Sequence, residues 1–115
     1  MAQNKNISFT RGDSYFLTFN ITSGEQHIIP ERIYFTVKES EYDVEYKIQK
    51  TLSNGVIQLS NGNYQLTINP QDTENLEIGQ KYGYDIEIIY NGITKTILIG
   101  TFTVTKEYTL RANEV

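Results

Sequence analysis

Few side chains in this sequence could catalyse a reaction, and histidine is the scarcest of them. The only histidine is His27, which lies in the polar segment 23–27. A general base needs an orienting partner and a nucleophile within hydrogen-bond reach. The chain has no cysteine, and the Gly-x-Ser-x-Gly elbow of many hydrolases is missing. We therefore interpret His27 as a solvated loop residue and expect the protein not to be an enzyme.

Four carboxylates occupy every second position of one short segment: Glu39, Glu41, Asp43 and Glu45. If this segment is extended, all four project from one face. Such a face could hold calcium or supply the carboxylate pair of a small glycoside hydrolase, but the EF-hand spacing is absent. We favour a solvated, self-repelling strand edge, and we expect no metal and no cofactor.

The tripeptide Arg11-Gly12-Asp13 matches the sequence that integrins recognise. Three residues recur by chance too often to predict binding. The tripeptide directly precedes a strongly alternating segment, so we predict a structural turn in which Gly12 supplies a positive φ.

Length and charge exclude several function classes. The chain has 115 residues and a net charge of −4, from 10 Lys and Arg against 14 Asp and Glu. This length suits one domain. A negative chain without a basic patch repels phosphate backbones, so we expect no nucleic-acid partner. Residues 1–6 are polar and no apolar run approaches about 18 residues, so we expect no secretion signal and no membrane insertion.

Apolar and polar residues alternate with a period of two, which is typical of antiparallel strands with one buried face. The alternating segments are 15–21, 33–37, 44–48, 64–68 and 82–90. A further short strand, Val56–Leu59, lies between two Ser-Asn-Gly turns. Asn91 and Gly92 tolerate positive φ at both central positions, so they predict a type I′ hairpin.

Two other segments depart from the simple alternation. Pro70 at a first helical position and Gly79 at a left-handed exit predict one short helical turn near residues 70–77. In the last strand the apolar phase changes near Gly100, which predicts a bulge or a tight bend there.

Together these elements predict an all-β fold. We expect an antiparallel two-sheet β-sandwich, immunoglobulin-like, with seven or eight strands and the one helical turn. An eight-stranded barrel is the alternative. The prediction is a single domain over residues 1–115, with loose terminal arms at 1–6 and 106–115.

Aromatic residues supply candidates for both the core and an interface. The chain has nine tyrosines and no tryptophan. Six tyrosines share the apolar phase and are expected in the core: Tyr15, Tyr46, Tyr64, Tyr82, Tyr84 and Tyr90. Tyr82 or Tyr84 follows the helical turn, where a tyrosine corner would hydrogen-bond back to it. Apolar residues that are out of phase or in the tail form the candidate protein interface if they cluster: Phe16, Tyr34, Ile89, Tyr108 and Leu110.

Three segments together resemble a family of small β-sandwich structural proteins of tailed bacteriophages and prophages. They are Phe9–Tyr15 with its charged turn, Ile68–Gly79 with a Pro-x-Asp-Thr turn, and Thr96–Thr105 with a Gly-x-Phe-x-Val strand end. The N-terminal domain of siphophage baseplate upper proteins is similar. The resemblance extends over about Ile7–Thr109.

This resemblance implies a virion structural protein, either a tail or baseplate component or a head-decoration protein. Its partners would be other virion proteins or copies of itself, and a symmetric homo-oligomer fits that role. It would be made in the bacterial host cytoplasm and reside in the virion. The tyrosine-rich composition leaves an alternative, a host-surface carbohydrate- or receptor-binding module.

Overall fold

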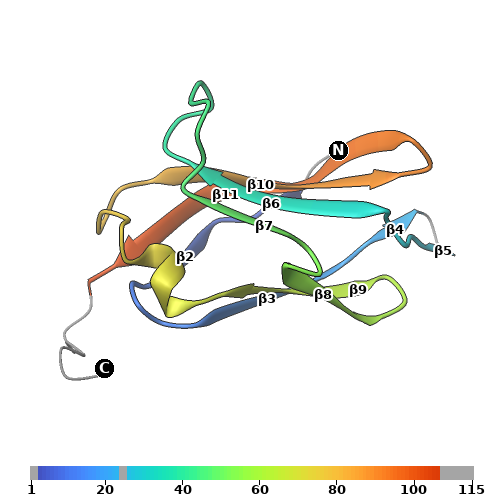
Figure 1. Ribbon diagram of the computed structural model, residues 1–115, viewed down its shortest axis with the longest axis horizontal. Coiled ribbons are helices and arrows are strands. Elements are labelled where there is room, and N and C mark those ends of the chain that lie inside the picture. Colours follow the sequence, from blue (N-terminus) through green and yellow to red (C-terminus); the bar gives the residue numbers. More distant parts are fainter. Residues whose placement is uncertain (1–2, 24–25, 107–115) are drawn as a thin grey trace.

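Figure 1 shows a computed structural model of the chain, which describes residues 3–23 and 26–106. The described chain is nearly all β, and eight of its strands have four or more residues. The strands are β1 (Gln3–Asn4), β2 (Ile7–Thr10), β3 (Tyr15–Asn20), β4 (Thr22–Ser23), β5 (Gln26–His27), β6 (Arg32–Lys38), β7 (Ile48–Leu52), β8 (Gly55–Ser60), β9 (Asn63–Ile68), β10 (Tyr82–Tyr90) and β11 (Ile93–Thr105). Among the described residues the one helical element is η1 (Pro70–Thr73), a 3-10 turn inside the predicted 70–77 segment.

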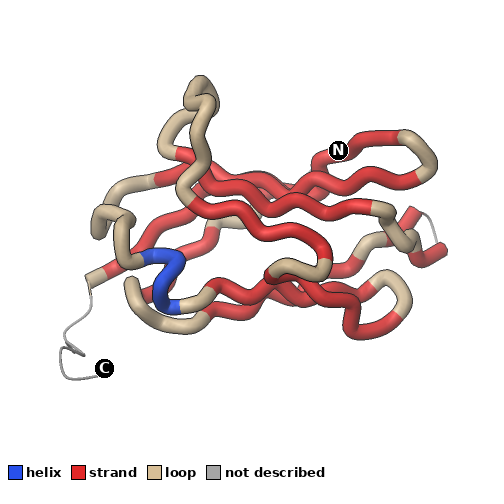
Figure 2. Tube along the Cα trace, viewed as in Figure 1, coloured by secondary structure: helices blue, strands red, loops and turns tan. Residues whose placement is uncertain are grey.

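The long strands form one hydrogen-bonded sheet that curls over on itself. Its order is β1-β11-β10-β6-β7-β8-β9-β3, and β2 also pairs with β11. The curl places β3, β9 and β8 in one layer, opposite a layer of β6, β10 and β11 (Figures 1 and 2). The small β4–β5 hairpin forms a sheet of its own.

Strand β7 makes the sheet continuous where two separate sheets were expected. Residues Ile48–Thr51 pair antiparallel with β6, and Thr51 and Leu52 then pair parallel with β8. The β1–β11 and β2–β11 pairs are also parallel, which differs from the fully antiparallel prediction. Gln3 and Asn4, expected in the loose N-terminal arm, form β1 against β11.

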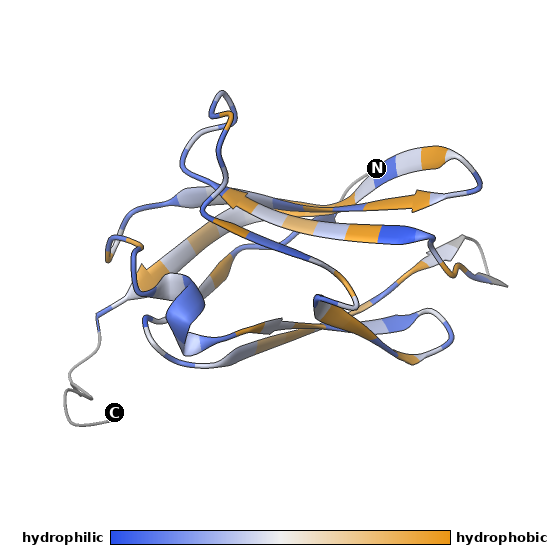
Figure 3. Cartoon of the chain, in the orientation of Figure 1, coloured by the Kyte–Doolittle hydropathy of each residue, from blue (hydrophilic) through white to orange (hydrophobic). Residues whose placement is uncertain are grey.

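The core lies between the two layers and follows the predicted alternation. Every second residue of β6, β9 and β10 is buried, so apolar and polar colours alternate along these strands (Figure 3). The largest side chains that are almost fully buried include Phe35, Tyr64, Ile86 and Phe102. Both layers contribute to one apolar cluster, so each layer buries its apolar face against the other.

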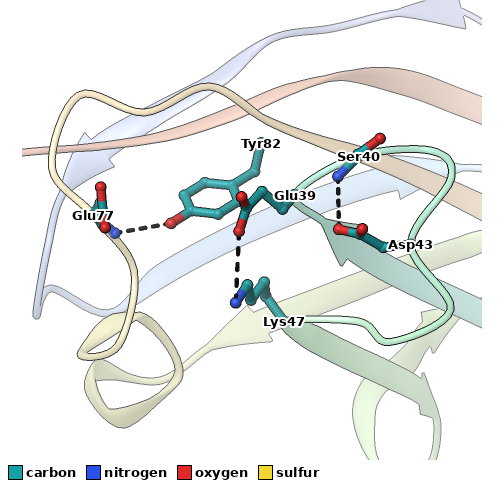
Figure 4. Close-up of polar contacts among 6 residues, drawn as sticks. All are labelled: Glu39, Ser40, Asp43, Lys47, Glu77 and Tyr82. Atoms are coloured by element: carbon teal, nitrogen blue, oxygen red, sulfur yellow. Dashed lines mark hydrogen bonds and ion pairs between the residues drawn. The ribbon is translucent and has the colours of Figure 1, made fainter.

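The tyrosine predictions were largely right. Tyr64, Tyr82 and Tyr84 are buried, and Tyr15 and Tyr90 pack against the core. The hydroxyl of Tyr82 accepts a hydrogen bond from the backbone N–H of Glu77 (2.9 Å; Figure 4), which confirms the predicted tyrosine corner.

Tyr46 was wrongly placed in the core, because the segment 39–47 is a loop rather than the start of a strand. Tyr46 is 54% exposed and β7 begins only at Ile48. The chain turns back earlier, where the N–H of Ser40 donates to the Asp43 carboxylate (3.1 Å; Figure 4). A local side-chain bond of this kind competes with strand pairing.

The turn at η1 is held by charged and polar contacts. The N–H of Asn69 donates to the carboxylate of Asp72 (2.7 Å), which also forms an ion pair with Lys50 of β7 (2.8 Å). Leu76, just beyond the turn, is buried and anchors it to the core.

The irregularity of the last strand was predicted at the wrong residue. The bulge falls at Ile97, because Leu98 pairs with Ile86 whereas Thr96 pairs with Glu87. Gly100 has a different role, since a Cβ there would lie 2.2 Å from the carbonyl oxygen of Lys5. Its missing side chain lets Lys5 come this close to β11 between β1 and β2.

The Asn91-Gly92 hairpin between β10 and β11 is confirmed. Asn91 has φ 49° and Gly92 has φ 73°, the positive values that the predicted turn requires.

Candidate functional site

The predicted interface residues do not form one cluster. Phe16 is 58% exposed on β3, on the face opposite buried Leu17. Tyr34 and Ile89 are partly buried on the outer faces of β6 and β10, in the other layer. Tyr108 and Leu110 lie outside the described residues. The exposed aromatic of one layer is therefore separated by the core from the other two.

The layer that carries Phe16 differs from the rest of the surface in its charge. Strands β3, β8 and β9 have six residues each, and none of these is Asp, Glu, Lys or Arg. Charged residues make up 21% of the whole chain. We call β3, β8 and β9 the charge-free layer.

The outer face of the charge-free layer presents large apolar side chains among small uncharged polar ones. Phe16 lies beside Thr67 of β9, and Ile57 of β8 lies in one row with Gln65 and Thr18. Phe16 is 58% exposed and Ile57 is 51% exposed. An exposed apolar surface without charges is typical of the centre of a protein–protein interface.

Strand β3 also leaves one edge of the sheet open. Across the described ranges, 3–23 and 26–106, it pairs only with β9, through six consecutive residue pairs without a register shift. Proline, charged residues and bulges are the usual devices that protect a strand edge, and β3 has none of them. The opposite edge is interrupted, because β1 and β2 are separated at Lys5–Asn6.

A groove of about 620 Å³, which we call the polar groove because most of its lining side chains are polar or charged, lies on the outer face of the other layer. It is lined by side chains of β6, β7 and β10, including Tyr34, Gln49, Asp85 and Glu87. Partial burial raises the pKa of Asp85 above its ordinary value, and nearby Lys38 opposes this rise. An aromatic ring beside carboxylates and an amide is the chemistry that binds sugar hydroxyls.

Tyr84 also borders this groove, but its side chain points into the core. It is 4% exposed, and its hydroxyl donates to the carbonyl of Lys5 (2.5 Å). Burial raises the pKa of Tyr84 to about 12, with a smaller contribution from Tyr15. The groove therefore offers one tyrosine ring, from Tyr34, rather than two.

The four carboxylates of segment 39–45 do not share one extended face. Glu39 pairs with Lys47 (3.8 Å), whereas Asp43 closes the turn with Ser40 (Figure 4). Tyr42 is 86% exposed near the tip of this loop. In the part of the chain that the structure describes, no group of three or more His, Cys, Asp or Glu is placed to hold a metal ion.

The Arg-Gly-Asp tripeptide is a structural turn, as predicted. Gly12 has φ 87°, and its N–H donates to the hydroxyl of Thr73 (3.0 Å). The Arg11 guanidinium donates to the carbonyl of Leu76 (3.4 Å). The turn thus joins the β2–β3 connection to η1.

His27 is exposed, as predicted, but it lies in the short strand β5 rather than in an open loop. Its ring lies against the β8–β9 turn, where a Cβ on Gly62 would be 2.5 Å from Nδ1.

Among the residues described, no helix is long and apolar enough to span a membrane.

Comparison with known proteins finds no family model that matches this chain and no similar curated protein. The candidate site is therefore defined from the surface of this chain alone, and it is the charge-free layer. Ile57 and Leu59, both about half exposed, were missed as interface candidates. The signal for them is visible in the sequence, because the whole segment 55–68 lacks a charged residue.

Proposed function

We propose that this chain is a non-enzymatic structural protein of a tailed-bacteriophage or prophage virion, acting through protein–protein contacts. The observation that supports it best is the charge-free layer with its exposed Phe16 and Ile57. Water solvates such a surface poorly, so covering it with a partner is favourable. The partners would be other virion proteins or copies of this chain, in a tail, baseplate or head-decoration position.

We also propose that the curled sheet is an immunoglobulin-like sandwich. In that fold one sheet has the strand order B–E–D and the other has C–F–G. The pairings β3–β9–β8 and β6–β10–β11 follow these two orders. The tyrosine corner at Tyr82 is a second feature shared with such domains.

The experiment that tests the virion role is particle composition. Tailed particles would be purified on a density gradient from the bacterium that encodes the chain, and their peptides identified by mass spectrometry. We expect the chain in the particle fraction. Ile57→Lys should reduce its incorporation, because a buried lysine without a partner opposes contact. Thr94→Lys, on an exposed residue of β11, is the matched control. Absence of the wild-type chain from the particles would contradict the proposal.

A second candidate function, binding of a host-surface saccharide, is favoured by the polar groove. Tyr34 would stack on a sugar ring while Asp85 and Gln49 accept and donate hydrogen bonds to its hydroxyls. Calorimetric titration with neutral oligosaccharides tests this idea. Binding that Tyr34→Ala abolishes and Phe16→Ala preserves would support it, and no heat with any sugar would argue against it.

A further inference from the structure

We propose that two copies of the chain pair through β3, antiparallel, about a two-fold axis that passes through Thr18. This inference rests on the proposed function, since it names one partner of the charge-free layer. The pairing would join the three strands of that layer in each copy into one six-stranded sheet.

The hydrogen-bonding groups of the open edge can be assigned from one contact. The N–H of Ile21, directly after β3, donates to the carbonyl of Gly62 on the β9 side (2.7 Å). Backbone groups alternate sides along an extended strand, so the odd-numbered residues of β3 face β9. The N–H and C=O groups of Phe16, Thr18 and Asn20 therefore face the open edge.

Two constraints select the register. Paired residues point their side chains to the same face, so an exposed residue must pair with an exposed one. A two-fold axis at Thr18 pairs Thr18 with its counterpart and Phe16 with Asn20 of the second copy. All outward backbone groups of both strands are then satisfied. An axis at Leu17 would pair Phe16 with Thr18 and leave Asn20 without a partner.

The charge distribution favours a second copy as the occupant. Each copy carries a net charge of −4, so most of its surface repels another copy. The charge-free layer carries none of that charge. Threonine opposite threonine is also a favourable cross-strand pair.

The fold further limits this pairing to a closed dimer. A sheet edge that meets a different edge can grow into a filament, whereas a two-fold contact uses the same edge twice and closes. The other edge is interrupted at Lys5–Asn6, where the Asn6 side chain accepts a hydrogen bond from the N–H of Thr101 (3.1 Å). It offers no comparable run of free backbone groups.

Disulfide trapping tests the proposed register directly, because the chain has no cysteine of its own. In the Thr18→Cys variant the two cysteines would be on directly opposed residues, with Cα atoms about 5.5 Å apart, within disulfide reach. We expect a covalent dimer under mild oxidation. The matched control is Thr67→Cys, on the outer face of β9 but away from the edge, which should give no covalent dimer.

A mixed experiment guards against a variant that fails to fold. Phe16→Cys and Asn20→Cys, mixed and oxidised, should give the heterodimer in preference to either homodimer.

Light scattering on Thr18→Lys should show loss of the dimer, because two lysines would face each other at the axis. Thr67→Lys should leave the dimer in place.

Two results would overturn the pairing: a wild-type monomer at every concentration, or trapping no stronger at Thr18 than at Thr67. Neither result would disprove the virion role, because a partner other than a second copy could cover the charge-free layer. The particle experiment tests that role separately. Loss of the chain from particles, with trapping intact, would instead remove the virion role and keep the dimer.

Discussion

The two layers of this sheet share one core but differ in what they present to solvent. The layer of β6, β10 and β11 carries charged residues on its outer face, among them Arg32, Lys38 and Glu87, and holds the polar groove. The charge-free layer carries none and exposes Phe16 and Ile57, whereas the other layer exposes Ile93 and Ile99 of β11 on a face that also bears charges. Stability requires apolar inner faces only, so the outer-face difference points to function.

The two edges of the sheet repeat this contrast. The β1–β2 edge is interrupted near Lys5, whose carbonyl accepts the hydrogen bond of the Tyr84 hydroxyl and lies close to Gly100. The β3 edge is regular and unprotected. A natural protein rarely leaves such an edge exposed unless something pairs with it.

The largest predicted effect concerns the core that the two layers share. Phe35→Ala in β6 and Leu66→Ala in β9 each remove a side chain with no exposed surface. We expect the free energy of unfolding to fall by about 3–5 kcal/mol and 2–5 kcal/mol, respectively. Urea denaturation followed by circular dichroism measures both. A nearly silent substitution in one layer would mean that the layers do not depend on one core.

The second prediction tests the contrast between the two edges of the sheet. In Gly100→Ala the new methyl group meets the Lys5 carbonyl, so β1 must move away from β11. We expect a loss of about 1–3 kcal/mol in the free energy of unfolding, with faster amide exchange at Lys5. Gly83→Ala is the matched control, since its Cβ meets nothing within 4 Å. Equal behaviour of the two variants would contradict this role of Gly100.

A smaller effect is expected from Tyr84→Phe, which removes the hydrogen bond to Lys5. The free energy of unfolding should fall by about 0.5–1.5 kcal/mol at pH 7. The wild-type Tyr84 has a folded pKa of about 12 against 10.0 in the unfolded chain, so its contribution is complete below pH 10 and is lost as the pH rises toward 12. The variant should therefore lose less stability than the wild type over that range, in thermal melts at stepped pH. An identical alkaline profile would contradict this assignment.

The smallest predicted effect tests whether the charges on the layer of β6, β10 and β11 serve function rather than stability. Burial raises the pKa of Asp85 in the folded protein, so its ionised form opposes folding at neutral pH. This penalty disappears as the pH falls through the folded pKa toward the ordinary value of 3.8. Asp85→Asn should raise the stability at pH 7 by less than about 0.5 kcal/mol, and the gain should vanish near pH 3. A stability loss at pH 7 would show that the carboxylate is favourably paired.

Local patterns predicted the local structure well. Alternation identified most strands, and the residues at Asn91-Gly92, Gly12 and Tyr82 were sufficient for the hairpin, the turn and the tyrosine corner. These features depend on neighbours close in the sequence, or on a backbone conformation that few residues adopt. The same pattern misplaced Tyr46, because a turn closed by Ser40 and Asp43 interrupts the alternation.

Features that depend on distant partners could not be predicted in the same way. The crossing of β7 between layers and the bulge at Ile97 follow from pairing with strands far along the chain. The charge-free segment 55–68 can be read from the sequence, but its pairing with β3 cannot. Only that pairing turns two uncharged stretches into one surface and leaves β3 at its edge.

Amide hydrogen–deuterium exchange over a concentration series tests most directly whether the charge-free layer is the contact surface. We expect protection of the N–H groups of Phe16, Thr18 and Asn20 to rise with protein concentration. Protection of β6 and β10 should stay constant over the same series. Protection of β3 that never changes with concentration, or a change confined to the groove strands, would contradict contact through the charge-free layer.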